Sequence, residues 1–389
     1  MLEIVGGIYR EICAYPYWDQ FFGSGLRGAI ALSSGLKDQI TLHSCIGKKD
    51  MASITEQCRI YGIKAILSET EQTTCFQYFH PLSQPTVEII NSKYKLDLIK
   101  ATNILFYGFA EASVSVEADY LVYDPQNWER FSDTGSKANH LALVLNANEA
   151  YLLSGLDRSQ DLNMVGQYLL KYEGADVVVI KNAAQGALVI ENNSIHEIGL
   201  FETNSVWPIG SGDVFSAAFA WRWAVLKEDP LDAANFASQC TAGYCNGAHL
   251  PIPLNNLPLF QLPIAKKAKA IYLAGPFFSI SQRWLIEEAR HLLTNFGSSV
   301  FSPLHDVGDG PSKEIVPLDL KGIDDCDVVF AILNGLDPGT IFETGYAIAK
   351  GKKVIIFAEN VTTTDLVMFK GTDCEIVTDF ATAIYKAAW

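Results

Sequence analysis

Apolar positions along the chain fall into short continuous runs that alternate with amphipathic stretches. The runs at 141–145 and 177–180 are apolar throughout, which is typical of parallel strands buried on both faces. Helical patterns lie between and beside them, at 150–156 and 162–172. This alternation of strand and helix predicts an α/β sandwich.

The same pattern extends over the rest of the chain. Earlier strands are predicted at 2–8, 40–46, 65–67, 74–80, 104–107 and 121–123. After residue 270, strands are predicted at 271–274, 328–333 and 354–357, with helices at 281–293 and 341–350. Apolar residues recur at helical spacing in the first of these helices, which is expected to bury Trp284, Leu285, Ala289, Leu292 and Leu293.

Length and composition bound the class of protein. With 389 residues, of which 49% are hydrophobic, the chain suits two domains with sizeable cores. The formal net charge of -15 argues against nucleic acid and anionic membranes as partners and favours small-molecule ligands. No apolar run reaches membrane-spanning length, and the eight cysteines include no CxxC pair. We therefore expect a cytoplasmic protein, and we also expect a homo-oligomer.

A cluster of prolines separates the two predicted domains. Four prolines lie between residues 251 and 263, and Lys266, Lys267 and Lys269 follow. We therefore predict one domain at 1–255, a linker at 256–269 and a second domain at 270–389.

The stretch 337–347 reads Asp-Pro-Gly-Thr-Ile-Phe-Glu-Thr-Gly-Tyr-Ala and follows the strand predicted at 328–333. α/β folds place ligands at such strand-to-helix turns. Gly339 lets the backbone come close to a ligand. Glu343 is expected in the first turn of the helix, where the positive end of the dipole favours an ionised carboxylate. Taken alone, Asp337 and Glu343 could merely cap and solvate a helix start.

The complete pattern resembles the nucleoside 2-deoxyribosyltransferase family, whose motif is D-x-G-T-x-x-E-x-G-Y-A. Residues 271–277, Ile-Tyr-Leu-Ala-Gly-Pro-Phe, are similar to the first strand and base-stacking loop of that family. The resemblance covers about 270–389. It implies a flavodoxin-like or Rossmann-like α/β domain with a parallel sheet and no cofactor.

The resemblance also implies residue roles. Glu343 would be the nucleophile that captures the glycosidic carbon, and Asp337 the acid that protonates the departing base. The sugar- and base-binding residues would be Tyr272, Gly275, Phe277, Asp319 and Gly339. Asp365 stands where transferases often use Asn to steady the sugar, so transfer to a second base and hydrolysis both remain open.

A second motif, Trp207-Pro-Ile-Gly-Ser-Gly-Asp213, opens a helical run at 214–226. A glycine-rich turn at a helix N-terminus presents free amides to anions. The segment resembles the signature of the ribokinase-like (PfkB) carbohydrate kinase family, which ends in G-A-G-D before an apolar helix. Asn146-Ala-Asn-Glu149 is similar to the N-x-x-E of that family. The resemblance covers about 1–255 and implies a ribokinase-like α/β/α sandwich.

The kinase resemblance implies a second set of roles. Asp213 would take the proton of the acceptor hydroxyl. The phosphate- and ATP-binding residues would be Gly210, Ser211, Gly212, Lys181 and Gly186, with the amides of residues 211–213 holding the transferring phosphate. Asn146 and Glu149 would organise Mg²⁺ through waters. The implied cofactors are ATP and Mg²⁺.

The chain departs from the kinase family on the acceptor side. The usual D-T before the terminal glycines is replaced by Trp207 and Pro208, and the sugar-binding Asn by Ala29. The acceptor residues would then be Glu11, Gly25 and Arg27, so the acceptor is not ordinary ribose by default.

The two resemblances together predict a bifunctional enzyme that acts on nucleosides, sugars and ATP. One domain would cleave or transfer a (deoxy)ribosyl group, and the other would phosphorylate a sugar or nucleoside hydroxyl. The order of the two reactions remains open. In the alternative hypothesis, the protein is a nucleoside or nucleotide N-glycosidase whose kinase-like domain is a non-catalytic binding or scaffolding module.

Overall fold

The computed structural model describes residues 1–88, 94–126, 129–192, 194–257, 269–308 and 310–389. The chain divides into two compact units, Met1–Thr203 with Trp207–Ile264 and Asn204–Val206 with Ala265–Trp389. Most of the linker predicted at 256–269 lies outside the described residues. Within the described part of the chain, no helix is both long and apolar enough to cross a lipid bilayer.

The first unit is built on a nine-stranded sheet that is parallel except at one edge, where β14 and β15 run antiparallel. In spatial order the strands are β15 (Ser194–Ile198), β14 (Ala187–Glu191), β13 (Val177–Lys181), β12 (Lys137–Asn146), β11 (Val116–Asp124), β9 (Ile99–Tyr107), β1 (Leu2–Val5), β4 (Ile40–Gly47) and β5 (Ile63–Thr70). The strand predicted at 2–8 ends at Val5, because the chain leaves the sheet where the Gly25 amide donates to the Gly7 carbonyl (3.0 Å).

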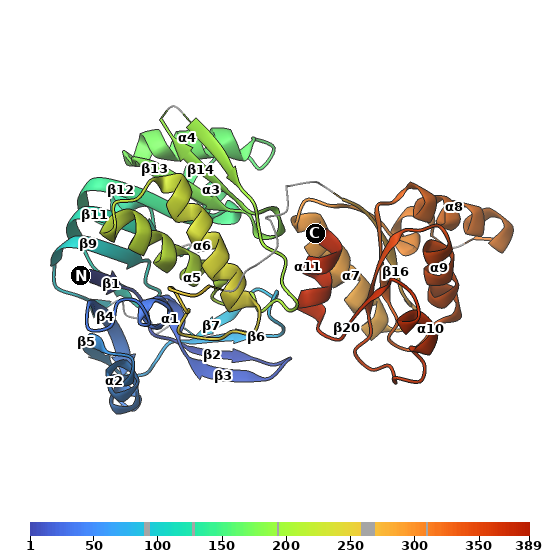
Figure 1. Cartoon of the computed structure of the whole chain (residues 1–389), viewed down its shortest axis with the longest axis horizontal. Coiled ribbons are helices and arrows are strands. Elements are labelled where there is room, and N and C mark those ends of the chain that lie inside the picture. Colours follow the sequence, from blue (N-terminus) through green and yellow to red (C-terminus); the bar gives the residue numbers. More distant parts are fainter. Residues whose placement is uncertain (89–93, 127–128, 193, 258–268, 309) are drawn as a thin grey trace. The chain divides into compact units, whose positions relative to one another are not determined.

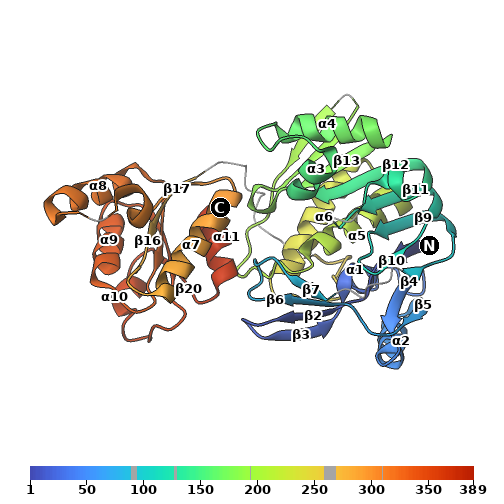
Figure 2. The same ribbon diagram turned by 180° about the vertical axis from the view of Figure 1, so that it is seen from behind.

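Helices cover both faces of this sheet (Figure 1, and from behind in Figure 2). One apolar core is shared by α1 (Gly23–Leu32), α2 (Met51–Ile60), α5 (Ser211–Ala220) and α6 (Pro230–Cys245). The core on the opposite face is shared by α3 (Ala147–Ser154) and α4 (Leu162–Glu173). Successive strand residues alternate between the two cores, as Ile4 and Val5 do. The predicted α/β/α sandwich is confirmed.

Two small sheets complete the first unit. The larger one, which we call the lid sheet, has the order β3 (Trp18–Phe21), β2 (Arg10–Cys13), β6 (Cys75–Tyr78) and β7 (Thr86–Glu88). β8 (Tyr94–Lys95) pairs with β10 (Ala112–Ser113). Short helical turns lie at η1 (Phe131–Asp133), η2 (Ala183–Gln185) and η3 (Trp221–Val225). Of the lid strands, sequence periodicity indicates only the run at 74–80.

The second unit contains a five-stranded parallel sheet. Its spatial order is β17 (Ser299–Phe301), β16 (Ala270–Ala274), β18 (Val328–Ile332), β19 (Lys353–Phe357) and β20 (Glu375–Val377). Numbered along the chain this is the order 2-1-3-4-5, which is flavodoxin-like and confirms the predicted fold class. Its strand order reverses between β16 and β18, so a ligand crevice is expected at their carboxyl ends.

Helices also cover both faces of this second sheet (Figure 1). α8 (Ser312–Asp325), α9 (Pro338–Ala349) and α10 (Val367–Lys370) share a core with one face. α7 (Ile280–Asn295) and α11 (Phe380–Ala388) contact each other on the opposite face, and the turn η4 (Pro303–Val307) follows β17. α7 begins at a capping box formed by Ser279 and Gln282.

Two sequence expectations about these helices are wrong. Trp284 is 44% exposed rather than buried, because Ile286 faces the sheet and a residue two positions away on a helix points to the opposite side. The second concerns α9, which begins at Pro338 rather than at residue 341, since Asp337 caps it and proline suits the first helical position. Glu343 therefore lies in the second turn of α9, beyond the stretch where the helix dipole acts most strongly.

Candidate active sites

The site in the second unit is organised around the carboxylate of Glu343. Glu343 projects from α9, which follows β18, and the Tyr272 hydroxyl from β16 donates to its Oε1 at 2.8 Å. Tyr272 is fully buried and stacks on Phe301 with 5.4 Å between ring centroids. Strand β16 and the helix that follows β18, on the two sides of the switch point, thus supply the phenol and the carboxylate that it orients.

Burial dominates the electrostatics of this carboxylate. It raises the pKa of Glu343 to about 7, while the hydrogen bond from Tyr272 opposes the rise and the charges of Asp319 and Asp337 add to it. Glu343 is therefore poised between its neutral and ionised forms near pH 7, which is the range in which a carboxylate can serve in catalysis.

Asp319 and Asp337 lie close enough to Glu343 for their charges to affect it, but they are held differently. Asp319 lies on α8, and its Oδ1 is buried with no hydrogen-bond partner among the described residues. Burial raises the pKa of Asp319. Asp337 Oδ2 accepts from both the amide (2.7 Å) and the hydroxyl (2.9 Å) of Thr340, so one oxygen caps α9. An unpaired buried acceptor such as Asp319 Oδ1 suits a ligand hydroxyl.

The three remaining predicted residues of this site have identifiable local roles. A Cβ on Gly275 would lie 2.7 Å from Ile286 Cδ1, so the close packing of α7 on β16 leaves little room for a larger residue there. Phe277 is half-buried and accepts a hydrogen bond from Arg283 Nε through its carbonyl (2.9 Å). A Cβ on Gly339 would approach the capping Asp337 Oδ2 to 3.0 Å.

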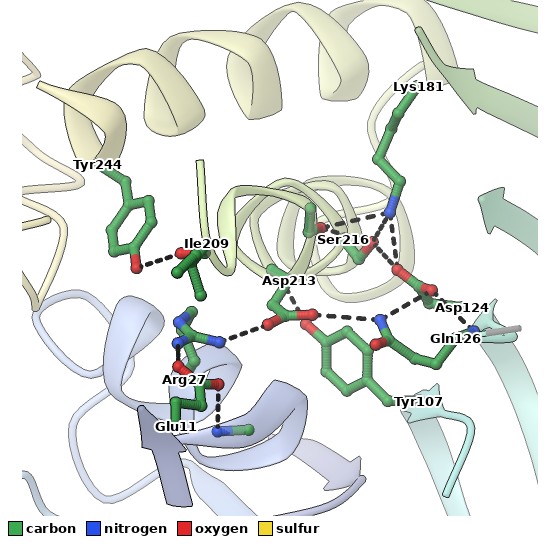
Figure 3. Close-up of polar contacts among 12 residues, drawn as sticks. Glu11, Arg27, Tyr107, Asp124, Gln126, Lys181, Ile209, Asp213, Ser216 and Tyr244 are labelled. Carbon is green, nitrogen blue, oxygen red and sulfur yellow. Dashed lines mark hydrogen bonds and ion pairs between the residues drawn. The ribbon is translucent and has the colours of Figure 1, made fainter. Parts of the chain in front are cut away.

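In the first unit, the turn before α5 positions Asp213. Gly210 has φ +78°, and a Cβ there would lie 2.1 Å from Arg27 Nε, so only glycine fits this turn. Tyr107 Oη donates to the Asp213 carbonyl (2.6 Å), and Tyr244 Oη donates to the Ile209 carbonyl (2.7 Å) (Figure 3). Two buried phenols therefore fix the turn and the first helical residues.

The carboxylate of Asp213 is bonded through both oxygens, as Figure 3 shows. Arg27 Nη1 donates to Oδ2 at 2.7 Å, and Gln126 Nε2 donates to Oδ1 at 3.1 Å. Arg27 also pairs with Glu11, whose Oε1 accepts from the Gly23 amide at 3.0 Å. Burial raises the pKa of Asp213 to about 6, although Arg27 opposes this rise.

A second charged group lies beside Asp213 in Figure 3. Lys181 Nζ at the end of β13 donates to Asp124 Oδ2 at 2.8 Å, and Ser216 Oγ donates to the same oxygen at 2.6 Å. Gln126 Nε2 bridges this group to Asp213, since it also donates to Asp124 Oδ1 at 3.1 Å. Sequence reasoning identified Lys181 but missed the other three residues. Asp124 had a usable signal, because it directly follows the apolar run at 121–123 and so ends a parallel strand.

The predicted anion site at the start of α5 is smaller than expected. The Ser211 amide donates to the Pro208 carbonyl at 3.0 Å and is therefore not available to a phosphate. The amides of Gly212 and Asp213 have no acceptor among the described residues. Two first-turn amides, rather than three, can face an anion.

The predicted metal residues form a helix cap. Asn146 Oδ1 accepts from the Glu149 amide (2.9 Å), and Glu149 Oε2 accepts from the Asn146 amide (2.7 Å). Burial raises the pKa of Glu149 to about 7, and the charge of Asp124 adds to the rise. In the described ranges, no group of three His, Cys, Asp or Glu side chains could ligate a metal directly.

Two predicted glycines are explained by backbone packing. A Cβ on Gly25 would lie 2.4 Å from the Gly6 carbonyl oxygen, where α1 meets the end of β1. Gly186 has φ +79°, and a Cβ there would lie 2.0 Å from the Ile198 carbonyl oxygen. Both positions require glycine whether or not a ligand binds nearby.

Two family models match the chain. Residues 110–246 match the pfkB family carbohydrate kinases, and residues 271–377 match Nucleoside 2-deoxyribosyltransferase. Both resemblances seen in the sequence are thereby confirmed. No curated protein matches this chain.

Solved structures similar to the chain include kinases of the ribokinase family. Ribokinase from Giardia lamblia is 16% identical, with a TM-score of 0.51 over 65% of this chain and 96% of its own. A pyrophosphate-dependent kinase in the ribokinase family, complexed with a pyrophosphate analog and myo-inositol, is 15% identical, with a TM-score of 0.48 over 66% of this chain and 98% of its own. The likeness to the Giardia lamblia enzyme shows a shared fold.

Proposed function

Because the chain joins a kinase domain of the PfkB family to a domain of the nucleoside 2-deoxyribosyltransferase family, we propose that it is a two-site enzyme of nucleoside and sugar metabolism. The observation that carries this proposal is the half-buried Glu343 carboxylate, oriented by Tyr272 at the switch point of a parallel sheet. All eight cysteines are free thiols, which favours a reducing, cytoplasmic location.

In the proposed reaction, Glu343 attacks the anomeric carbon of a nucleoside. A carboxylate oxygen forms a bond to that carbon as the carbon–nitrogen bond to the base breaks, and the bonding electrons leave with the base. Asp337 supplies the proton that the base takes up. Asp319 Oδ1, which has no partner among the described residues, accepts a hydrogen bond from a hydroxyl of the sugar. The oxygen of water or the ring nitrogen of a second base then bonds to the anomeric carbon, the Glu343 carboxylate leaves with the electrons of the ester bond, and Asp337 takes back a proton.

The pH dependence of base release tests the assignment of Glu343. Because only the ionised carboxylate attacks and its pKa is raised to about 7, kcat/KM should rise with pH through about 7. Tyr272→Phe removes a hydrogen bond that lowers this pKa and should move the rise to higher pH. Asp319→Asn removes a charge that raises it and should move the rise to lower pH. Shifts of both variants in the same direction would contradict this electrostatic account.

Transfer and hydrolysis are separated by supplying one deoxynucleoside with and without a different free base. We expect a new nucleoside in the second tube, since the domain belongs to a transferase family. Reducing sugar formed at equal rates in both tubes, with no new nucleoside, would show that water resolves the ester instead. Liquid chromatography with mass spectrometry measures both products.

In the first unit, we propose that Asp213 accepts the proton of an acceptor hydroxyl as that oxygen attacks the terminal phosphate of ATP. The Gly212 and Asp213 amides would face the charge of the transferring group. Lys181 Nζ lies beside them, 3.3 Å from the place that a Cβ on Gly212 would occupy. The electrons of the broken phosphorus–oxygen bond leave with ADP.

PfkB kinases generally use ATP and a divalent metal. Mg²⁺ typically binds through one or two carboxylates, waters and substrate phosphates, rather than in an all-protein cage. Among the described acids, Glu149 fits this mode, because the Asn146 amide occupies only its Oε2 (2.7 Å), whereas both oxygens of Asp124 already accept hydrogen bonds. Glu149 would hold the ion through a water, and the bound ion would neutralise phosphate charge.

One observation favours the second candidate function, a glycosyl enzyme with a non-catalytic kinase-like module. Both oxygens of Asp213 are already bonded, by Arg27 and Gln126, in a cluster buried from solvent. Binding of ATP without turnover on a broad panel of sugars and nucleosides would support this alternative.

A further inference from the structure

Four aromatic side chains lie beside the Arg27–Asp213 pair, and we call them the aromatic wall: Trp18, Phe22, Tyr78 and Trp207. Trp18 stacks on Phe22 with 6.1 Å between ring centroids and an interplanar angle of 16°. It also contacts Trp207, at 5.0 Å between centroids. The wall is assembled from the lid sheet, the residue before α1 and the turn before α5, so it is not a feature of one local segment.

Strand register places this wall on the reacting side of the lid sheet. Cys13 lies directly opposite Trp18 on β3 and beside Tyr78 on β6, and paired residues share a face. Glu11, two positions before Cys13, shares that face and pairs with Arg27. The Arg27 Cζ lies 5.0 Å from the centroid of the Phe22 ring. A molecule that reaches Asp213 beneath the lid sheet therefore meets these rings.

The wall also contains two hydrogen-bond donors that have no partner in the described part of the chain. The indole Nε1 atoms of Trp18 and Trp207 are buried, and none of the described residues accepts from them. Indole nitrogen can only donate, and a buried donor without an acceptor is unfavourable. A ligand that carries both a planar ring and acceptor atoms would stack on the wall and satisfy these donors. The carbonyl oxygens and ring nitrogens of a nucleobase meet both requirements.

The charges at the site favour a neutral acceptor over a phosphorylated one. Arg27 is paired with two carboxylates, Glu11 and Asp213, and Lys181 is paired with Asp124. Neither cation of this cluster is left without an anionic partner, so an added anionic group on the acceptor would meet net negative charge.

From these observations we propose that the acceptor of the kinase domain is a nucleoside with its base attached, which stacks on the aromatic wall and presents a sugar hydroxyl to Asp213. This inference rests on the proposed function of Asp213 as the proton acceptor. It places phosphorylation on a substrate whose glycosidic bond is intact. A free sugar released by the other domain is then a poor substrate of the kinase domain.

The test compares uridine, inosine and ribose as acceptors with Mg-ATP, in a Glu343→Ala background that prevents base release. We expect kcat/KM for either nucleoside to exceed that for ribose at least about tenfold, as stacking of one base on an aromatic ring allows. Trp18→Ala should remove most of that preference, so that the ratio of kcat/KM for uridine to kcat/KM for ribose falls towards one. Trp18→Phe, which keeps the ring but loses the donor, should lie between the two. Equal use of ribose and nucleosides, or an unchanged preference in Trp18→Ala, would overturn the inference.

A binding measurement keeps this inference separate from the proposed kinase activity. Uridine titrated without ATP should quench tryptophan fluorescence, and the quench should persist when a non-hydrolysable ATP analogue fills the donor site. It should be lost in Trp18→Phe/Trp207→Phe and retained in Trp284→Phe, which alters an exposed tryptophan of the other unit. Quenching without any phosphorylated product would contradict the kinase activity but preserve the nucleoside site. Product without this quench would contradict the site alone.

Discussion

Replacing Glu343 with alanine is expected to reduce base release at least about a thousandfold, because removal of a covalent nucleophile leaves only binding and polar stabilisation to act on the substrate. The variant also leaves the Tyr272 hydroxyl without its acceptor at 2.8 Å. Base release from a panel of nucleosides, followed by chromatography, measures the effect. Near-normal release by a folded Glu343→Ala protein would refute the assignment of the nucleophile.

Glu343→Gln provides the control for folding, and it should change the stability of the protein in a predictable direction. The folded-state pKa of Glu343 is raised to about 7 from an ordinary 4.5, so the folded protein holds this proton more tightly than the unfolded chain. The stabilisation from that proton is complete below about pH 4.5 and is lost as the pH rises through about 7. At pH 8 the free energy of unfolding of the uncharged glutamine variant should therefore be higher by on the order of 1–3 kcal/mol, as measured by denaturant titration. The same variant should be inactive.

A second control separates the loss of this carboxylate from a general loss of charge in the domain. Glu314 is an exposed acid in the first turn of α8. Glu314→Ala should leave base release within about twofold of the unchanged protein, since exposed surface substitutions rarely exceed half a kcal/mol.

The sequence alone predicts an element correctly where its local pattern agrees with the global fold. The apolar runs at 141–145 and 177–180 became the buried parallel strands β12 and β13, because only a sheet covered on both faces accepts continuous apolar residues. The Asp337-to-Ala347 motif likewise indicated the turn that carries Glu343. The pattern places the start of α9 too late, at residue 341, because it gives no weight to Asp337 as the cap and Pro338 as the first helical residue.

What the sequence did not reveal depends on contacts between distant segments. Gln126 gives no signal, because its role arises only when β11 brings it beside Asp213, 87 positions later in the chain. Arg27 could be placed on the acceptor side by resemblance, but its pairing with two carboxylates follows from how α1, α5 and the lid sheet meet. The aromatic wall likewise depends on contacts between distant segments, since Trp18 and Trp207 are far apart in sequence.

Asp213→Asn is expected to lower phosphoryl transfer by about a hundredfold to ten-thousandfold, the range typical of losing a positioned proton acceptor, while base release stays unchanged. Asparagine keeps the size of the side chain and can still accept from Arg27, so the turn before α5 should persist. Arg27 then keeps one anionic partner, Glu11. Unfolding by denaturant, monitored alongside both activities, shows whether that loss disturbs the fold.

The matched control for this substitution is Glu111→Gln. Glu111 is another buried acid of the same unit, and burial raises its pKa to about 7. In the described part of the chain, Glu111 forms no hydrogen bond or ion pair with Arg27 or Asp213. Its amide variant should retain phosphoryl transfer within a fewfold of the unchanged protein. Transfer that survives in Asp213→Asn would show that another group takes the proton. A joint loss of transfer and base release in a folded Asp213→Asn protein would show that the two sites are coupled, because a substitution confined to one independent site cannot abolish the chemistry of the other.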